Sequence, residues 1–252
     1  MRSLRQRLRW WLFPGINLHA RLRFHVLPSY FGQTRGKPLD VLDAGCGNGM
    51  LTYQACRRGN RVLGVSIKQE EVLNCRRLFN EYLGISTDRL QFESINLYEL
   101  DSLGRQFDEI ICSEVLEHLV RDGDVVRSFF KLLRPGGVLH LCTPNADHPD
   151  NASSPLDPGE TGGHVRPGYT LESYRRLLEP AGFRIVESRG IGGPIREFFN
   201  RRIIAAERAH GFWAGALLFL VAQLLVWLDP ANPGCPYSIY VRVMKQADAA
   251  QN

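Results

Sequence analysis

The hexapeptide SEVLEH, residues 113 to 118, brings two carboxylates and an imidazole within five positions. It follows an apolar run, residues 110 to 112, that is typical of a buried strand. On a helix, Glu114, Glu117 and His118 would stand at positions i, i+3 and i+4 and would share one face. Such a face can hold a divalent metal ion, move a proton or simply face solvent. Which of these roles applies depends on the helices and strands that position this segment.

The composition allows one sizeable core, alone or with a small appendage, because the chain has 252 residues of which 44% are hydrophobic. The six cysteines form no CxxC pair, which argues against a zinc knuckle or a disulfide framework and favours a reducing, cytoplasmic location. We expect no secretory signal, because the apolar run that ends at Pro14 is only four residues long.

The net charge of +5 is unevenly distributed. Residues 1 to 39 carry eight basic and no acidic side chains, so the rest of the chain has a net charge of −3. An aromatic and apolar cluster at residues 10 to 13 lies beside four arginines, a mixture that suits anionic lipid headgroups. A helix packed on the domain with a solvated basic side is the alternative, and a nucleic-acid arm fits less well. Residues 1–36 are predicted to be a basic amphipathic arm.

From residue 38 onward, short apolar runs alternate with helical patterns. Strands are predicted at residues 38–45, 60–67, 88–95, 107–113 and 136–143. Helices are predicted at residues 50–59, 68–84 and 122–137. This alternation predicts an α/β fold with a doubly wound parallel sheet.

A long segment, residues 143 to 169, contains five prolines and no periodicity, and a loop of that length in a compact domain is usually functional. A helix is predicted at residues 171–179, capped by Thr170, followed by a strand at residues 183–190 and a last strand at residues 237–245.

Between those two strands, residues 211 to 228 are almost uniformly apolar. As a helix they would measure about 27 Å, close to the roughly 30 Å hydrocarbon core of a bilayer. A single crossing would separate the last strand from its sheet. Residues 194–232 are therefore predicted to form an apolar helical hairpin that lies in one leaflet or covers the active site, with a buried core or dimer helix as the alternative. The domains would then be the arm, a core at 37–193, this insertion, and a last strand with a tail at 233–252.

The sequence VLDAGCGNG, residues 41 to 49, follows a predicted strand and opens a predicted helix. Its glycines allow a sharp turn and a close approach to a ligand at the carboxyl edge of the sheet. The spacing is GxGxG and not the GxGxxG of dinucleotide sites, and Asp43 would repel a pyrophosphate but attract a cation.

This glycine motif resembles motif I of the class I S-adenosylmethionine-dependent methyltransferases, and LLRPGGVLHL resembles their fifth-strand signature. The order of the predicted elements is also similar to their seven-stranded, Rossmann-like sheet with helices on both faces. The resemblance implies S-adenosylmethionine as the cofactor. It assigns the cofactor's amino acid part to Asp43 and the loop of Gly45, Cys46, Gly47 and Gly49, and the adenine to Asn96 and Leu97.

The second predicted strand ends in Ser66, where this family usually has an acid that binds the ribose. This is similar to cyclopropane-fatty-acid synthases and other lipid methyltransferases, in which a polar residue five positions later assists, here Glu71. The resemblance also implies that Ile67, Ser113 and Tyr30 lie beside the cofactor.

SEVLEH resembles the ExxEH motif of ubiquinone-pathway O-methyltransferases and small-RNA 3′-end methyltransferases, where it ligates metal together with a later histidine. His164 stands at the matching place here. Glu114, Glu117, His118 and His164 are therefore the candidate catalytic residues and ligands of a divalent cation such as Mg²⁺. His118 acting alone as a base, with the glutamates contacting only the cofactor, is the alternative.

These observations predict a methyltransferase, peripheral on a membrane, that methylates an oxygen of a prenylated, sterol-like or lipid-linked acceptor. The rival interpretations are carbon methylation of an isoprenoid or lipid, a non-catalytic subunit that binds S-adenosylmethionine, and a nicotinamide oxidoreductase. No nucleic-acid partner is expected, and the protein would be a monomer or a homodimer.

Overall fold

The chain forms two compact units in a computed structural model that describes residues 13, 15–33, 36–230 and 233–246. One unit combines Met1–Leu27 with Gly190–Tyr237, and the other combines Pro28–Arg189 with Ser238–Asn252. The basic and aromatic residues 2 to 12 of the predicted arm lie outside the described residues.

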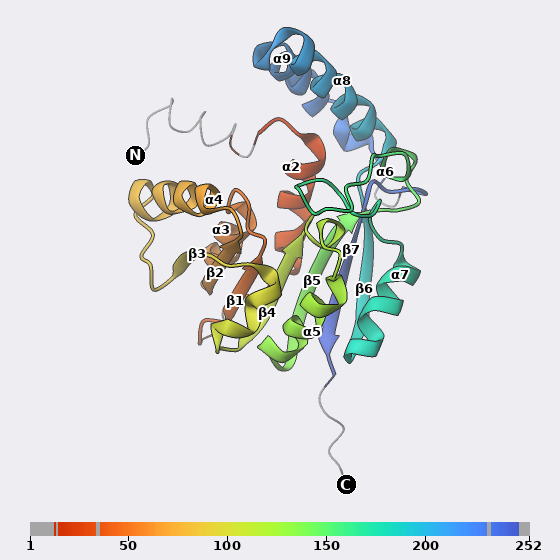
Figure 1. Ribbon diagram of the computed structural model, residues 1–252. Helices are drawn as coiled ribbons and strands as arrows, with labels where there is room; N and C mark the ends of the chain where they lie inside the picture. The colour runs from red at the N-terminus through yellow and green to blue at the C-terminus, as the bar shows by residue number, and fades with distance from the viewer. Residues whose placement is uncertain (1–12, 14, 34–35, 231–232, 247–252) are drawn as a thin grey trace. The chain divides into compact units, whose positions relative to one another are not determined.

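A seven-stranded sheet has the order β3-β2-β1-β4-β5-β7-β6 (Figure 1). The strands are β1 Asp40–Ala44, β2 Arg61–Ser66, β3 Leu90–Ser94, β4 Phe107–Ser113, β5 Leu133–Pro144, β6 Phe183–Ile191 and β7 Ser238–Lys245. Strands β1 to β5 pair in parallel, as predicted. Strand β7 pairs with β5 in antiparallel fashion, so the sheet is mixed, and the predicted seven-stranded, Rossmann-like α/β fold is confirmed.

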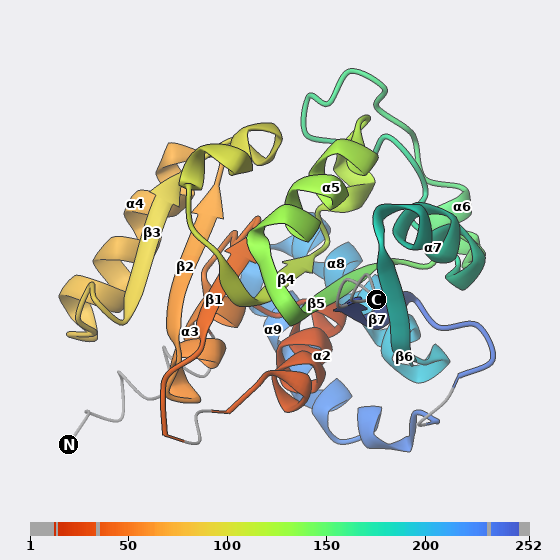
Figure 2. The same cartoon turned by 90° about the horizontal axis from the view of Figure 1, so that it is seen from below.

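Helices cover both faces of this sheet (Figure 2). They are α3 Met50–Arg57, α4 Gln69–Cys75 with a π-helical continuation Arg76–Tyr82, α5 Asp122–Leu132 and α7 Leu171–Leu178, whereas the short α6 Pro149–Ala152 belongs to the segment between β5 and α7. Successive side chains of a strand point to opposite faces. Leu42 and Ala44 of β1 accordingly join the core under α5 and α7, whereas Asp43 faces α3 and accepts a hydrogen bond from Thr52.

All seven predicted strands and the helices of this unit form close to their predicted ranges. The exception is SEVLEH, which is not an α-helix. Glu114 has a φ of 57°, in the left-handed region, and only Leu116–His118 forms a single 3₁₀ turn. The reason is that Glu114 N donates to Cys142 O at 2.7 Å, which extends the pairing of β4 with β5 past Ser113.

The other unit contains α2 Leu18–Val26, α8 Pro194–His210, α9 Phe212–Gln223 and a 3₁₀ turn Val226–Leu228. Helices α8 and α9 are joined at Gly211 and pack side by side as a hairpin (Figure 1). The core of this unit is formed by Ile16, Leu18, Ile203, Phe219, Ala222 and Val226. The predicted eighteen-residue apolar helix is shorter in the structure, because α9 has 12 residues. Among the described helices, none combines the length and apolarity that a membrane crossing requires.

Candidate active site

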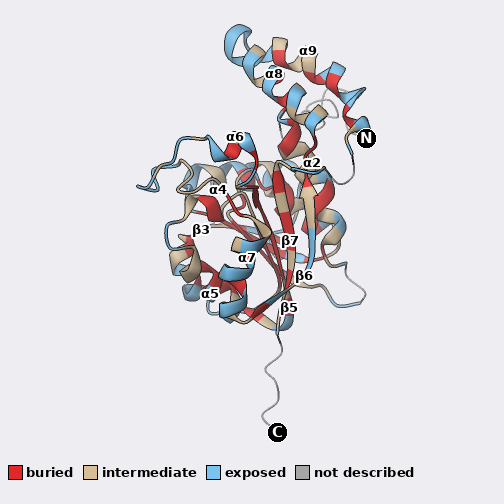
Figure 3. Ribbon diagram, turned by 90° about the vertical axis from the view of Figure 1, so that its right-hand side faces the viewer, coloured by how far each residue is buried: buried red, intermediate tan, exposed pale blue. Residues whose placement is uncertain are grey.

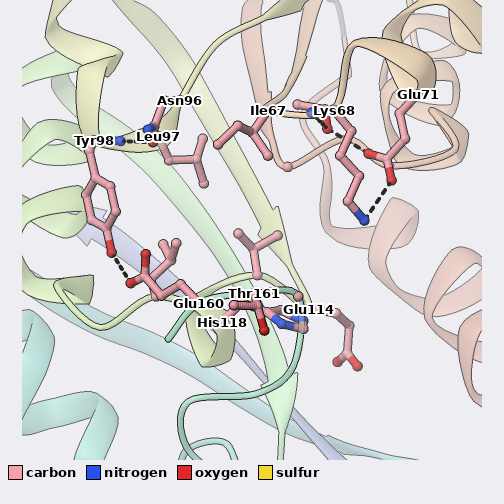
Figure 4. A pocket seen from close by; sticks show the side chains of 16 residues that line it. Ile67, Lys68, Glu71, Asn96, Leu97, Tyr98, Glu114, His118, Glu160 and Thr161 are labelled. Carbon is pink, nitrogen blue, oxygen red and sulfur yellow. Dashed lines mark hydrogen bonds and ion pairs between the residues drawn. The ribbon is translucent and has the colours of Figure 1, made fainter. Parts of the chain in front are cut away.

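The site lies where the strand order changes direction, between the adjacent strands β1 and β4. The loops that follow these two strands diverge at their carboxyl ends, which is where open α/β sheets bind ligands. A pocket of about 390 Å³ opens there (Figure 4). It is lined by Gly45, Gly47, Ser66, Ile67, Lys68, Glu71, Asn96, Leu97, Tyr98, Glu114, Val115, His118, Leu119, Glu160, Thr161 and Gly162.

The glycine loop forms one wall of this pocket. Gly45, Gly47 and Gly49 have φ angles of 85°, 49° and 74°, which favour glycine. Gly45 N and Cys46 N both donate to Val65 O, at 2.9 and 2.8 Å, and these bonds hold the loop against β2. A Cβ on Gly45 would lie 2.4 Å from a methyl of Val115, whereas a Cβ on Gly47 would meet no atom within 4 Å. Gly47 therefore leaves its space open to a ligand.

Several predicted cofactor residues support the pocket without lining it. Cys46 and Asp43 are buried, Gly49 packs against Phe79 and Cys75, and Ser113 ends β4. Asp43 accepts a hydrogen bond from Thr52 Oγ1 at 2.6 Å. Burial raises the pKa of Asp43 from 3.8 to about 6, although the bond from Thr52 opposes this shift.

The raised pKa of Asp43 predicts a pH dependence of ligand affinity. If this carboxylate attracts the ammonium group of the ligand, as the resemblance implies, the affinity for S-adenosylhomocysteine should fall as pH drops below about 6, by about tenfold per unit. Calorimetric titrations between pH 5 and pH 8 measure this, and Asp43→Asn should abolish the dependence. If the affinity of the unmodified protein does not change with pH, Asp43 does not attract the ammonium group of the ligand.

The stability of the unliganded protein should change in the opposite direction. Because the folded protein disfavours the ionised form of Asp43, this residue stabilises the fold fully below pH 3.8, and the contribution is lost as pH rises through about 6. Urea unfolding at the same pH values, with Asp43→Asn as the control, checks this sign.

Ser66 and Glu71 stand together at the end of β2. Ser66 Oγ donates to Glu71 Oε2 at 2.6 Å, and Lys68 Nζ lies 3.6 Å from Glu71 Oε1 (Figure 4). The helix that begins at Gln69 thus supplies the carboxylate that the strand end lacks. A carboxylate and a hydroxyl in one place can bind vicinal hydroxyl groups.

The segment after β3 faces the pocket with Asn96, Leu97 and Tyr98. Asn96 Oδ1 accepts from Tyr98 N at 3.1 Å and caps the 3₁₀ turn Leu97–Leu103. Tyr98 Oη donates to Glu160 Oε1 at 2.5 Å (Figure 4). Val120 N donates to the same oxygen.

Glu160, which belongs to the proline-rich loop and has a φ of 53°, was not among the site residues predicted from the sequence. Its bonds with Tyr98 and Val120 hold its pKa below the ordinary value and tie the loop across the pocket. The length of the loop was the only signal of its role. Lys68, Tyr98 and Thr161 were missed as well.

Three of the four predicted catalytic residues come together beside the pocket. Glu117, His118 and His164 each offer a ligand atom within 4.8 Å of the others. His118 Nε2 lies 3.9 Å from Glu117 Oε1, and the two imidazole rings lie 4.7 Å apart, centroid to centroid. The loop that carries His164 is held in place because Val165 N donates to Glu117 O at 2.8 Å.

The surroundings of these two histidines determine the tautomer of the neutral His118 ring and the direction in which the pKa of His164 shifts. His118 Nδ1 lies 2.8 Å from Gly163 O, and a carbonyl only accepts, so Nδ1 carries a proton and Nε2 keeps its lone pair in the neutral ring. Burial, and then the proximity of His118, lower the pKa of His164 and favour its neutral form. Two imidazoles and a carboxylate form a donor set that suits a divalent transition metal, and a histidine whose second nitrogen donates to a carbonyl is typical of metal ligands.

Glu114 does not join this group. Its left-handed backbone directs the carboxylate away from His118 (Figure 4), and Ser238 Oγ donates to Glu114 Oε1 at 3.4 Å. The shared helical face that the spacing predicted for Glu114, Glu117 and His118 is therefore absent, because SEVLEH is not helical.

Tyr30 is not among the residues that line the described pocket. Its ring lies 4.6 Å from that of Tyr240, and its hydroxyl accepts from Arg189 at 3.3 Å. In this arrangement, packing on β7 accounts for the residue.

Comparison with known proteins agrees with the family that the sequence motifs resemble. A family model described as a methyltransferase domain matches residues 17–188, more than half of the chain. A ubiquinone biosynthesis O-methyltransferase from Psychrobacter cryohalolentis is 39% identical over 106 residues, which are 42% of this chain and 40% of that protein. The match thus spans about two fifths of the length of that relative.

Solved structures share the fold. The [4+2]-cyclase SpnF has a TM-score of 0.61 at 17% identity, covering 89% of this chain and 80% of its own. Magnesium protoporphyrin IX methyltransferase from Synechocystis, with bound S-adenosylmethionine, has a TM-score of 0.52 at 17% identity, covering 91% and 78%. Because one of these neighbours is a cyclase, the fold by itself does not determine the reaction.

Proposed function

Since this chain belongs to the class I S-adenosylmethionine-dependent methyltransferases, we propose that it transfers the cofactor's methyl group to an oxygen of a hydrophobic acceptor. The acceptor would be prenylated, sterol-like or lipid-linked. The relatives named as ubiquinone biosynthesis O-methyltransferases support oxygen as the methylated atom and a quinone-pathway intermediate as the acceptor class. The observation that carries the proposal is the position of His118, on the wall of the cofactor pocket with its Nδ1 proton held by Gly163 O.

The proposed reaction is an in-line displacement in which the acceptor oxygen forms a bond to the methyl carbon while the bond from that carbon to sulfur breaks. The acceptor's hydroxyl proton passes to His118 Nε2, the atom that keeps its lone pair, and S-adenosylhomocysteine leaves. The carboxylate of Glu117, whose Oε1 lies 3.9 Å from Nε2, stabilises the imidazolium that results.

A divalent ion fits the same three residues. Glu117, His118 and His164 would hold it, and when bound it would lower the pKa of a hydroxyl group beside it. With two nitrogens and one oxygen, the group favours zinc or iron over the Mg²⁺ that four ligands including both glutamates suggested. In that case His118 positions the ion and does not act as the base.

The test uses the purified protein, methyl-labelled S-adenosylmethionine and a total extract of its host, with and without EDTA. We expect label in the organic phase. If the label disappears with EDTA, the ion is required, and if it persists, His118 serves as the base. Label in the aqueous phase alone would contradict the hydrophobic acceptor, and cofactor binding without any turnover would favour a non-catalytic subunit.

Carbon-methylated product would instead support the rival function, carbon methylation of an isoprenoid or lipid. The likeness of Ser66 and Glu71 to lipid methyltransferases also favours that function. Structure determination of the extracted product separates the two, because an O-methyl group and a C-methyl group have different carbon chemical shifts.

An enzyme with such an acceptor would work at the cytoplasmic surface of a membrane, as a peripheral protein. The exposed apolar residues of the hairpin support this location.

A further inference from the structure

Helix α9 is apolar on all sides, although only one side of it is packed. Gly215, Phe219 and Ala222 are buried, and the latter two join the core of their own unit with Ile16, Leu18 and Ile203. A helix that buries one face normally carries polar residues on the other. In α9 the only residue with a polar side chain is Gln223, at its last position.

The opposite side of α9 forms what we call the apolar stripe, composed of Trp213, Leu217, Leu220, Val221 and Leu224. The spacing of i, i+4, i+7, i+8 and i+11 puts these side chains on one face. Their exposed fractions range from 45% to 80%. Figure 3 shows the alternation of buried and exposed residues along the helix. Isolated exposed apolar residues are ordinary, but a contiguous set on one face indicates a binding surface.

Tryptophans stand at both ends of the apolar stripe. Trp213 is 80% exposed at its start, and Trp227 is 74% exposed in the 3₁₀ turn that follows the helix. Indole rings with one apolar body and one N–H are enriched where hydrocarbon meets headgroups. The 12 residues of α9 measure about 18 Å, too short for a crossing but suitable for a helix that lies in the plane of the interface.

The helix packed against α9 supplies the complementary charge. Helix α8 carries four arginines and two glutamates, and Arg201, Arg202 and Arg208 are exposed. Arg202 lies over the exposed ring of Phe198, 5.0 Å from its centroid. An uncharged apolar stripe beside a basic helix matches an anionic bilayer, in which acyl chains lie beneath phosphate groups.

We propose that the apolar stripe of α9, with Trp227 and the exposed Arg201, Arg202 and Arg208 of α8, is a membrane docking surface that binds anionic phospholipid. This deepens the proposed function by naming the partner of the enzyme, and it rests on that function for its purpose. The physical basis is independent of methyl transfer, because it requires only the exposed side chains of one compact unit.

The test is flotation of the full-length protein with vesicles of phosphatidylcholine, alone or mixed with phosphatidylglycerol. We expect the protein to float with the mixed vesicles and more weakly with phosphatidylcholine alone. Leu217→Asp combined with Leu224→Asp should lower the bound fraction at least about tenfold, because two apolar side chains leave the bilayer. Both residues are more than 60% exposed, so the fold should tolerate the change.

Two further variants serve as controls. Tyr82 is an aromatic residue of the other unit and is 55% exposed. The Tyr82→Asp variant should float like the unmodified protein. Leu217→Ser with Leu224→Ser removes the apolar groups without adding charge and should show an intermediate loss. Every variant should bind S-adenosylhomocysteine with unchanged affinity in calorimetry, and this measurement separates a failure of docking from a failure of the proposed function.

Unchanged flotation of the double Asp variant would overturn the proposal. Equal binding to both kinds of vesicle would show that the arginines of α8 do not contribute to docking. If the unmodified protein does not float but sediments as a dimer, and the double Asp variant sediments as a monomer, the apolar stripe is an interface between two copies of the chain and the proposal is wrong.

Discussion

Replacing His118 by alanine should lower kcat by about 100- to 10,000-fold and leave the affinity for S-adenosylhomocysteine within a few fold. The imidazole lines the pocket and lies beside His164, so its loss removes the proton acceptor or a metal ligand. Single-turnover kinetics with the identified acceptor and calorimetry with S-adenosylhomocysteine measure the two quantities separately.

His25→Ala is the matched control for this experiment, since His25 is an exposed histidine of α2 in the other unit. It should leave both quantities unchanged. His118→Gln should be as slow as the alanine variant, because an amide can donate to Gly163 O but cannot accept a proton at neutral pH. Near-normal turnover in either His118 variant would contradict the assigned role and reduce the residue to holding the loop.

Replacing Gly47 by alanine should weaken binding of S-adenosylhomocysteine at least about tenfold, or about 1.4 kcal/mol, with only a small loss of stability. A Cβ at this position meets no protein atom within 4 Å, so it projects into space that the ligand needs. The φ of 49° is in the region that other residues adopt at a cost of about 1 kcal/mol. Calorimetry and urea unfolding give the two free energies.

Gly49→Ala provides the comparison, with the opposite result. Its Cβ would lie 2.6 Å from Phe79 and 2.9 Å from the sulfur of Cys75, so the packing of α3 against α4 must shift. We expect a loss of about 2 to 4 kcal/mol in the free energy of unfolding. Equal losses of stability in the two variants would show that Gly47 is needed for folding and not for the ligand.

The sequence alone was sufficient for the order of the strands and helices and for many of the residues that line the pocket. Short apolar runs located the strands, because helices cover both faces of the sheet and strands such as β1 and β2 are buried at nearly every position. The glycine loop was predictable because it follows a strand at the carboxyl edge of the sheet, whereas Ser66 with Glu71 and Asn96 with Leu97 were expected from the family resemblance, and all of these predicted residues except Gly49 and Cys46 line the pocket. These features depend on local geometry that neighbouring residues determine.

Only the tertiary structure decided which side chains act together. Spacing grouped Glu114 with Glu117 and His118, but pairing between the ends of β4 and β5 turns the backbone at Glu114 and separates it from them. Glu160 reaches Tyr98 across 62 positions, and no periodicity reveals such a contact. The uniform apolarity of residues 211 to 228 likewise did not indicate which face of α9 is exposed. In each case the reason is the same: a local pattern records the geometry of one element, whereas the position of a side chain relative to distant groups is set by how the elements pack.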